Sequence, residues 1–224
     1  MDKYNTLLFR AYEKVIGCLG GINWERAKTM ITGKRYFNLR DSDHDFLRST
    51  LAKGYYIILT RRNTHLSTYL ISLASLVNSG KLSHWSHALV NLEGDDPVLD
   101  TDFRLIEATG TGVHYSDFMK VFDCDSVVLL RPRNVSETEF NFLMEEVLEG
   151  NLQDQIGKKY DNLFDLMDNS RISCVELVRT ALKIIPGYES KFSDFESKIQ
   201  RYGNLTPGMF YDCADFEVIW ENRR

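Results

Sequence analysis

The stretch Ser173-Cys174-Val175-Glu176-Leu177-Val178 opens a run with helical spacing that continues to Ile184 and closes at Pro186-Gly187. It predicts a helix over residues 173–184 with a cysteine in its first turn. The dipole and the free amide groups of a helix N-terminus stabilise a thiolate. None of the other cysteines is expected at a helix start: Cys18, Cys124 and Cys213. Cys174 is therefore the candidate nucleophile.

Two apolar stretches upstream of this helix each carry one ionisable side chain. Residues 85–92 predict a strand that contains His87, and residues 103–108 predict a strand that contains Glu107. A second histidine, His84, lies three residues before His87, so the two would face opposite ways along one strand. A cysteine, a histidine and a carboxylate can act as nucleophile, base and orienting group. The histidine and the carboxylate also suit hydrogen-bonded structural roles, and the cysteine also suits a buried position as a small hydrophobe.

The grouping of expected strands and helices predicts the fold class. Strands are expected at residues 55–60, 85–92, 103–108, 125–130 and 216–220. Helices are expected at residues 65–78, 136–149 and 173–184, and Ser136 with Glu139 gives the second of these a capping-box pattern. This order predicts an α+β fold in which an antiparallel sheet or half-barrel packs against helices on one side.

The first 53 residues differ from the rest of the chain in pattern and charge. Residues 3–20 have apolar side chains three and four positions apart and predict an amphipathic helix that ends at Gly20-Gly21. Residues 43–52 predict a short helix. Residues 1–54 carry a net charge of +4, and the remaining 170 residues carry −9. We expect an N-terminal helical extension (1–53) and one domain (54–224); the basic segment would meet an acidic partner, meet its own domain or present a solvated face.

Length and composition limit the class of protein. A chain of 224 residues and 26.0 kDa buries roughly 70% of its unfolded surface, which is enough for an independent core. A net charge of −5 argues against nucleic-acid binding. Apolar runs reach about five residues, against ~20 for a membrane span, and no signal-peptide block is present, so we expect a cytoplasmic protein. No cysteine pair has zinc-finger or redox spacing, and we expect no metal and no cofactor.

Several segments, in this order, resemble the circularly permuted NlpC-type papain-like cysteine peptidases and amidases, in which the histidine strand precedes the cysteine helix. The resemblance covers roughly residues 54–220. It rests on Gly54-Tyr55-Tyr56-Ile57-Ile58-Leu59-Thr60, Ser86-His87-Ala88-Leu89-Val90, Ile106-Glu107-Ala108, Gly112-Val113, Gly157-Lys158-Lys159-Tyr160-Asp161, Ser173-Cys174-Val175-Glu176-Leu177-Val178 and Leu205-Thr206-Pro207-Gly208. The opening strand departs from the family, where Gly-Asp is common, and residues 1–53 match none of its motifs.

This resemblance implies a papain-like fold and catalysis through a thioester. It assigns Cys174 as nucleophile, His87 as base and Glu107 as the residue that orients the imidazole, and it places Tyr160 beside the thiol as an oxyanion or substrate contact. The implied substrate is a peptide or acyl amide, cell-wall derived or lipid-linked. Two alternatives stay open: an acyltransferase or thioesterase of the lecithin:retinol acyltransferase type, and a catalytically silent binding protein. The aromatic residues that would suit an acyl chain would equally suit a core: Tyr55, Tyr56, Trp85 and Tyr115.

Overall fold

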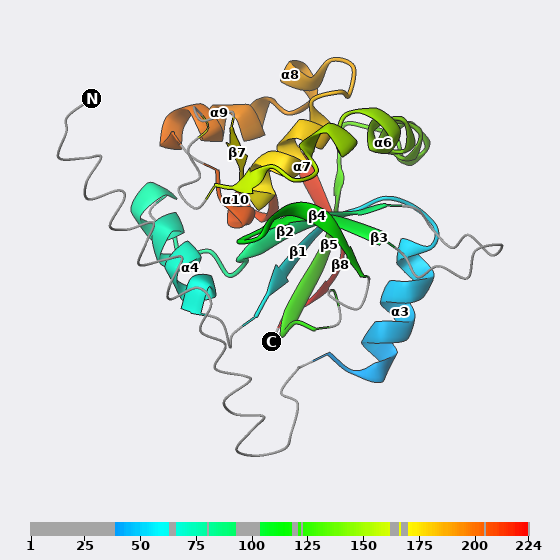
Figure 1. Cartoon of the computed structure of the whole chain (residues 1–224), viewed down its shortest axis with the longest axis horizontal. Helices are drawn as coiled ribbons and strands as arrows, with labels where there is room; N and C mark the ends of the chain where they lie inside the picture. Colours follow the sequence, from blue (N-terminus) through cyan, green and yellow to red (C-terminus); the bar gives the residue numbers. More distant parts are fainter. Residues whose placement is uncertain are drawn as a thin grey trace.

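The computed structural model describes residues 39–62, 66–79, 81–92, 104–117, 121, 123–161, 166, 170–203 and 205–223. Its centre is a six-stranded antiparallel sheet with the strand order β4-β3-β2-β1-β5-β8 (Figure 1). The strands are β1 (Ile57–Arg61), β2 (His87–Leu92), β3 (Arg104–Thr109), β4 (Gly112–Asp117), β5 (Ser126–Pro132) and β8 (Phe216–Asn222). The α+β class and the antiparallel sheet are confirmed, and the five predicted strands begin and end within two residues of the expected positions.

The helices of the described part gather mostly above the sheet in Figure 1. They are α3 (Asp41–Leu51), α4 (Leu66–Ser79), α6 (Glu137–Gly150), α7 (Cys174–Leu182), α8 (Tyr188–Lys191), α9 (Ser193–Tyr202) and α10 (Pro207–Tyr211), with a 3-10 turn, η1 (Gln153–Gln155). A short parallel pair, β6 (Lys159–Tyr160) and β7 (Arg171–Ile172), lies outside the main sheet. Within these residue ranges no helix combines the length and the apolar character that a bilayer crossing requires.

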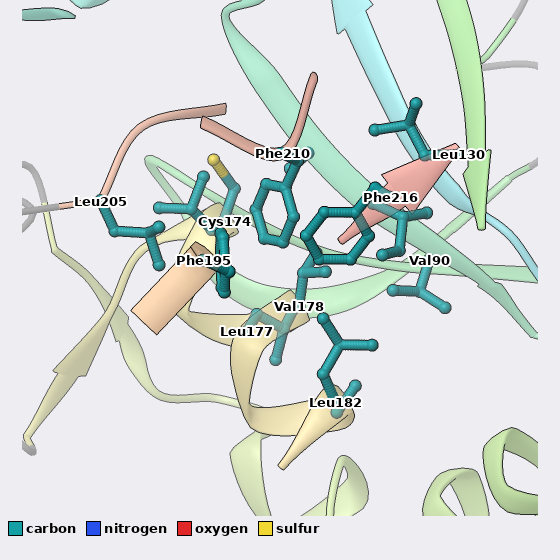
Figure 2. Packing of buried hydrophobic residues seen from close by; sticks show 14 of the residues in the cluster. Val90, Leu130, Cys174, Leu177, Val178, Leu182, Phe195, Leu205, Phe210 and Phe216 are labelled. Carbon is teal, nitrogen blue, oxygen red and sulfur yellow. The ribbon is translucent and has the colours of Figure 1, made fainter. Parts of the chain in front are cut away.

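Alternation along the strands gives the sheet two buried faces. Leu59 and Val90 belong to a large core that includes α6, α7, α9 and α10, whereas Ile58 and Leu89, one position away, belong to a second core. Figure 2 shows the first core, where three aromatic rings pack together beside α7: Phe195, Phe210 and Phe216. Their ring centroids lie 4.7 to 5.3 Å from one another. A sheet that is apolar on both faces needs cover on both.

α3 provides that cover on the second face. Its buried residues Leu47 and Leu51 pack with Ile58 and Leu89. The helices expected at residues 136–149 and 173–184 lie together on the first face, as predicted, but α3 shows that helices flank the sheet on two sides. The predicted boundary at residue 53 falls between α3 and β1. The amphipathic helix predicted for residues 3–20 lies outside the described residues.

Seven elements of the structure are not predicted from the sequence: β4, β6, β7, α8, α9, α10 and the 3-10 turn η1. β4 is an edge strand whose outward positions are polar or exposed, so it lacks the apolar run that marks the central strands. α9 is mostly polar and has three hydrophobic residues at helical spacing: Phe195, Ile199 and Tyr202. α10 is a single turn that begins with Pro207 at the position where a helix tolerates proline best.

α6 has half of its expected capping box. Ser136 Oγ accepts the backbone N–H of Glu139 at 3.2 Å, as predicted. The Glu139 carboxylate does not return to the helix start and instead accepts a hydrogen bond from Lys191 Nζ at 2.8 Å. This bond joins α6 to α8 across the surface of the first core.

The turn between β3 and β4 requires glycine at position 112. Gly112 has a φ of +102°, and a Cβ atom there would lie 2.5 Å from the carbonyl oxygen of Lys158. The approach is close because Val113 N–H donates to Lys158 O at 3.0 Å and Gly157 N–H donates to Val113 O at 2.9 Å. These two bonds hold the segment that leads into β6 against β4.

Gly112→Ala is predicted to destabilise the protein by about 2 kcal/mol, because the added methyl group strains the left-handed backbone and meets the Lys158 carbonyl. Gly110→Ala is the matched control in the same turn, since no atom lies within 4 Å of its Cβ position. We expect that variant to stay within about 0.5 kcal/mol of the parent. Urea unfolding followed by circular dichroism measures both, and equal unfolding midpoints would contradict the role given to Gly112.

Candidate active site

α7 begins at Cys174 because the preceding serine closes a capping box. Ser173 Oγ accepts the N–H of Glu176 at 3.3 Å, and the N–H of Ser173 donates to Glu176 Oε2 at 2.7 Å. Cys174 is the first helical residue, and its side chain is fully buried. Helix geometry leaves the first backbone N–H groups without an intrahelical acceptor. Such groups can bind an oxyanion that forms on a carbonyl attacked by the thiol.

β2 begins at His87, two residues later than expected. Thr60 of β1 pairs with His87, and its carbonyl oxygen accepts the N–H of Ser86 at 3.1 Å. Ser86 Oγ also lies 3.2 Å from Thr68 Oγ1 of α4. The backbone at His87 is therefore fixed from two sides, by β1 and by α4.

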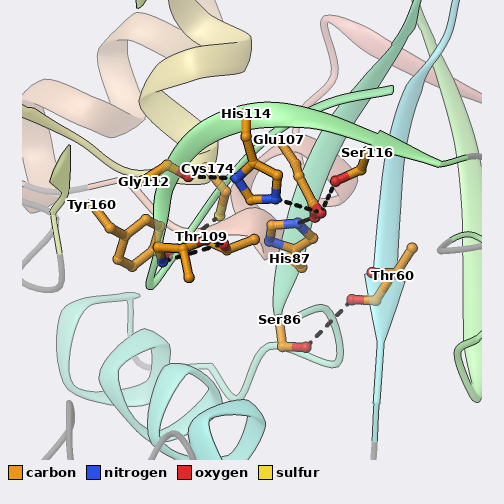
Figure 3. Close-up of polar contacts among 11 residues, drawn as sticks. Thr60, Ser86, His87, Glu107, Thr109, Gly112, His114, Ser116, Tyr160 and Cys174 are labelled. Atoms are coloured by element: carbon orange, nitrogen blue, oxygen red, sulfur yellow. Dashed lines mark hydrogen bonds and ion pairs between the residues drawn. The ribbon is translucent and has the colours of Figure 1, made fainter. Parts of the chain in front are cut away.

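The structure brings His87 and Glu107 into direct contact. The register of β2 and β3 pairs Val90 with Ile106, so His87 and Glu107 fall on the same face of the sheet. His87 Nε2 lies 2.8 Å from Glu107 Oε2 (Figure 3). Glu107 is only 3% exposed, and a carboxylate buried to this degree requires hydrogen-bonding partners.

Two further partners of Glu107 were not identified from the sequence. The Ser116 hydroxyl donates a short hydrogen bond to Glu107 Oε1, and His114 Nε2 lies 3.4 Å from the same oxygen. Both residues belong to β4, where His114 pairs directly with Glu107. The sequence contains a pattern that indicates the strand carrying them. After the turn at Gly112, His114 and Ser116 alternate with Val113 and Tyr115, as expected for the second strand of a hairpin.

Cys174 and Glu107 together favour the protonated form of His87. Burial lowers the pKa of this imidazole, but hydrogen bonds and charge interactions with Cys174 and Glu107 outweigh it and raise the pKa to about 9. Because Nε2 faces Glu107, Nδ1 is the ring nitrogen left for the thiol. At neutral pH the imidazole therefore holds a proton beside the sulfur atom.

Tyr160 lies on the other side of the thiol. Its hydroxyl donates to Cys174 Sγ at 3.9 Å. The contact follows from the parallel pairing of β6 with β7, which sets Tyr160 beside Ile172, two residues before the cysteine. Burial, followed by interactions with Cys174, raises the pKa of Tyr160 well above its ordinary value, so the phenol stays protonated and can donate.

His84 is not brought to the thiol. Its ring packs edge to face on Trp85, with centroids 4.9 Å apart, and its carbonyl oxygen accepts from Arg61 Nη1 at 2.6 Å. Burial, then the charges of Arg61 and Arg223, lower the pKa of His84 to about 4. This neutral imidazole faces arginines, whereas His87 faces a carboxylate and a thiol, so the two histidines have separate roles.

The thiol and the imidazole of the site differ in their exposure to solvent. Cys174 has no exposed surface, whereas the side chain of His87 keeps 23% of its surface exposed. A molecule that contacts this group of residues would therefore reach it from the side of the imidazole. Among the described residues, no group of three or more His, Cys, Asp and Glu side chains is placed to hold a metal ion. The described residues thus place the buried Cys174 thiol beside a phenol hydroxyl and an imidazole that is held by a carboxylate.

Comparison with known proteins gives information on the fold. A scan of the sequence against protein-family models gave no match, and a search among curated proteins gave none either. Among solved structures, the chain is similar to the metalloprotein yiiX from Escherichia coli O157:H7 (DUF1105), with a TM-score of 0.50 and 16% sequence identity. The match covers 76% of this chain and 97% of that chain. At this identity the likeness shows a shared fold and no more.

The pKa of His87 is predicted to be near 9 in the wild type and to fall in Glu107→Gln, because one of its two stabilising partners loses its charge. The folded-state pKa is raised above the ordinary 6.5. The stability that this proton provides is therefore fully present below pH 6.5 and is lost as the pH rises through 9.

NMR titration of isotopically labelled histidines measures this value directly. His84→Gln is the matched control, because it removes a histidine that faces Arg61 and Arg223 and should leave the His87 midpoint unchanged. A His87 midpoint at or below 6.5 in the wild type would show that the imidazole is not held by the thiol and the carboxylate.

Proposed function

We propose that the protein is a cysteine hydrolase that cleaves an amide bond of a peptide or acyl-amide substrate. The observation that carries the proposal is the position of His87 between Cys174 and Glu107, which together raise the pKa of the imidazole to about 9. An imidazole that gains a proton beside a cysteine sulfur leaves the sulfur as the nucleophile. Structural histidines in a core have no need of a thiol and a carboxylate at opposite ring nitrogens.

Acylation transfers one proton and forms one bond. The Cys174 thiol proton resides on His87, and the sulfur attacks the carbonyl carbon of the amide. The negative charge passes to the carbonyl oxygen, where the backbone N–H of Cys174 and the Tyr160 hydroxyl are the available donors. Collapse of this tetrahedral intermediate breaks the carbon–nitrogen bond, and His87 gives its proton to the departing amine. The product is a thioester on Cys174.

Deacylation returns the enzyme to its starting state. His87 takes a proton from a water molecule, whose oxygen attacks the thioester carbonyl. The sulfur leaves as a thiolate beside the protonated His87, and the carboxylic acid product is released. Glu107 stays ionised throughout and holds the ring orientation through its 2.8 Å contact with Nε2. Ser116 and His114 act only through Glu107 and are positioning residues.

We further propose that the fold is papain-like and of the circularly permuted NlpC type. The order His87, Glu107, Cys174 along the chain supports this assignment, as does the packing of the cysteine helix α7 against an antiparallel sheet through β2 and β3. The 3.9 Å contact of the Tyr160 hydroxyl with Cys174 Sγ also supports it.

The surroundings of the site favour a peptide or acyl amide over a long acyl chain. Trp85 and Tyr56 are buried to 99% and 96% of their surface in the two cores and so are not free to line an acyl tunnel. Tyr115 is exposed on β4, and Tyr55 packs against the first core. These aromatic residues mainly serve the fold.

Cys174→Ala is predicted to reduce amide or thioester hydrolysis by at least roughly 10³-fold while leaving the fold intact, because the small buried side chain fits the same space. Cys213→Ser is the matched control, since its hydroxyl keeps a donor for Asp194 and lies outside the site. The assay uses a panel of N-acyl amino-acid amides and peptidyl thioesters, with circular dichroism of each variant.

Trapping of the acyl-enzyme completes the test. Mass spectrometry of the wild type quenched in acid should find the acyl group on the peptide that contains Cys174. Faster turnover with an added amine than with water alone would assign acyl transfer in place of hydrolysis. Undiminished turnover by Cys174→Ala, or an acyl group on another residue, would refute the proposed nucleophile.

A further inference from the structure

The structure contains a cavity of about 160 Å³ that is lined by α7 and by the segments around β6 and β7. Residues of α7 and its C-cap line it at the spacing of one helix face: Glu176, Arg179, Thr180 and Lys183. Lys158, just before β6, and Arg171 of β7 also belong to the lining. We call this space the α7 cavity.

The α7 cavity and the Cys174 thiol lie on different sides of the helix. Each residue turns an α-helix by about 100°, so Glu176 is rotated by about 200° from Cys174. Arg179, Thr180 and Lys183 share the direction of Glu176. A ligand in the cavity would therefore leave the approach to the thiol open. The cavity is a second candidate site, separate from the residues around the thiol.

Positive side chains predominate in the lining of the cavity. Four cations contribute to it: Lys158, Arg171, Arg179 and Lys183. Glu176 is the one carboxylate in the lining, and its Oε2 accepts the N–H of Ser173 at the start of α7 at 2.7 Å. The whole chain, by contrast, has a net charge of −5. A hollow lined mainly by charges of one sign concentrates ions of the opposite sign.

Arg179 is held in place from α8 and α9. Its Nε and Nη2 donate to the two carboxylate oxygens of Glu196 at 2.8 and 2.7 Å. The Tyr188 hydroxyl donates a further short hydrogen bond to Glu196. Neither bond from Arg179 uses Nη1. A guanidinium that is already fixed loses little conformational freedom when it binds an anion.

The two lysines and the threonine supply donors that the described part of the chain does not use. No hydrogen bond or ion pair joins Lys158 Nζ, Thr180 Oγ1 or Lys183 Nζ to another described residue. Lys183 acts on Glu196 through its charge alone. Arg171 differs, because it already has an interaction partner. The cavity therefore offers two ammonium groups and a hydroxyl, beside a fixed guanidinium, to an acceptor from outside the domain.

We propose that the α7 cavity binds a phosphate group. Its volume suits a group of this size and is well below the roughly 300–1,000 Å³ of pockets that enclose a whole drug-sized ligand. A phosphate monoester carries a charge of about −1.5 to −2 at neutral pH and three acceptor oxygens, whereas a carboxylate carries a single charge. Several cationic donors around one small volume match the phosphate better. The group is either free phosphate or the end of a small phosphate ester.

The double variant Lys158→Gln/Lys183→Gln tests this proposal. Loss of both ammonium groups should raise the Kd for inorganic phosphate at least roughly tenfold, because charge-assisted hydrogen bonds are lost. Lys158 is half-buried and Lys183 is exposed, so we expect the fold to stay intact. Lys53→Gln/Lys81→Gln is the matched control: it removes the same charge from two exposed lysines that do not line the cavity.

The Kd is measured by NMR titration of the ¹⁵N-labelled full-length protein with sodium phosphate at neutral pH, with ionic strength held constant by sodium chloride. Amide signals around Thr180 should shift and saturate. Sodium acetate should bind at least roughly tenfold more weakly than phosphate. Glycerol 3-phosphate separates the two sources: binding at least as tight as that of inorganic phosphate assigns an ester, and weaker binding assigns the free ion.

Three results would overturn the proposal: no saturable shift around Thr180, equal phosphate affinity of the two double variants, or acetate binding as tight as phosphate binding. The titration involves neither the thiol nor any substrate of the proposed hydrolase. Its failure would therefore leave the assignment of Cys174 standing, and the loss of that assignment would leave the phosphate site standing.

Discussion

A carboxylate buried in the middle of a sheet is costly, and the candidate site is organised by the need to satisfy Glu107. One oxygen meets His87 at 2.8 Å, and the other meets Ser116 and His114. These contacts fix the imidazole with one nitrogen on the carboxylate and leave the other for Cys174. The chemistry that we propose depends on this fixed ring, because an imidazole free to rotate would not keep its proton beside the thiol.

The edge strand β4 links the surroundings of Glu107 to the other residues of the site. β4 supplies His114 and Ser116 from one end of its hairpin, and at the other end Gly112 brings the chain into contact with Lys158. That contact holds the start of β6 against β4, and the Tyr160 hydroxyl of β6 lies 3.9 Å from Cys174 Sγ. A single edge strand therefore connects the environment of Glu107 to the second donor at the sulfur. The two apolar cores therefore stabilise the sheet, and the edge strand β4 provides polar partners for Glu107.

Much of this arrangement could be predicted from particular residues. The apolar runs around Ile58, Leu89 and Leu129 marked central strands, and the segment at Ser173 marked the start of the cysteine helix. β4 escaped prediction because an edge strand that carries site residues has no apolar run. The roles of Ser116 and His114 could not be assigned from the sequence, because they depend on the register of β4 against β3, which pairs His114 with Glu107 and Ser116 with the neighbouring Leu105. α3 was expected as a helix, but its place on the second face follows from tertiary packing.

The most direct test is the rate at which each cysteine is alkylated by iodoacetamide as a function of pH, with sites mapped by mass spectrometry. Burial raises the pKa of the Cys124 and Cys213 thiols, so both should react slowly. The account predicts that Cys174 is alkylated faster than Cys124 and Cys213 at neutral pH, and that His87→Ala slows its alkylation. A rate at Cys174 no higher than at Cys124 and Cys213, or unchanged in His87→Ala, would contradict it.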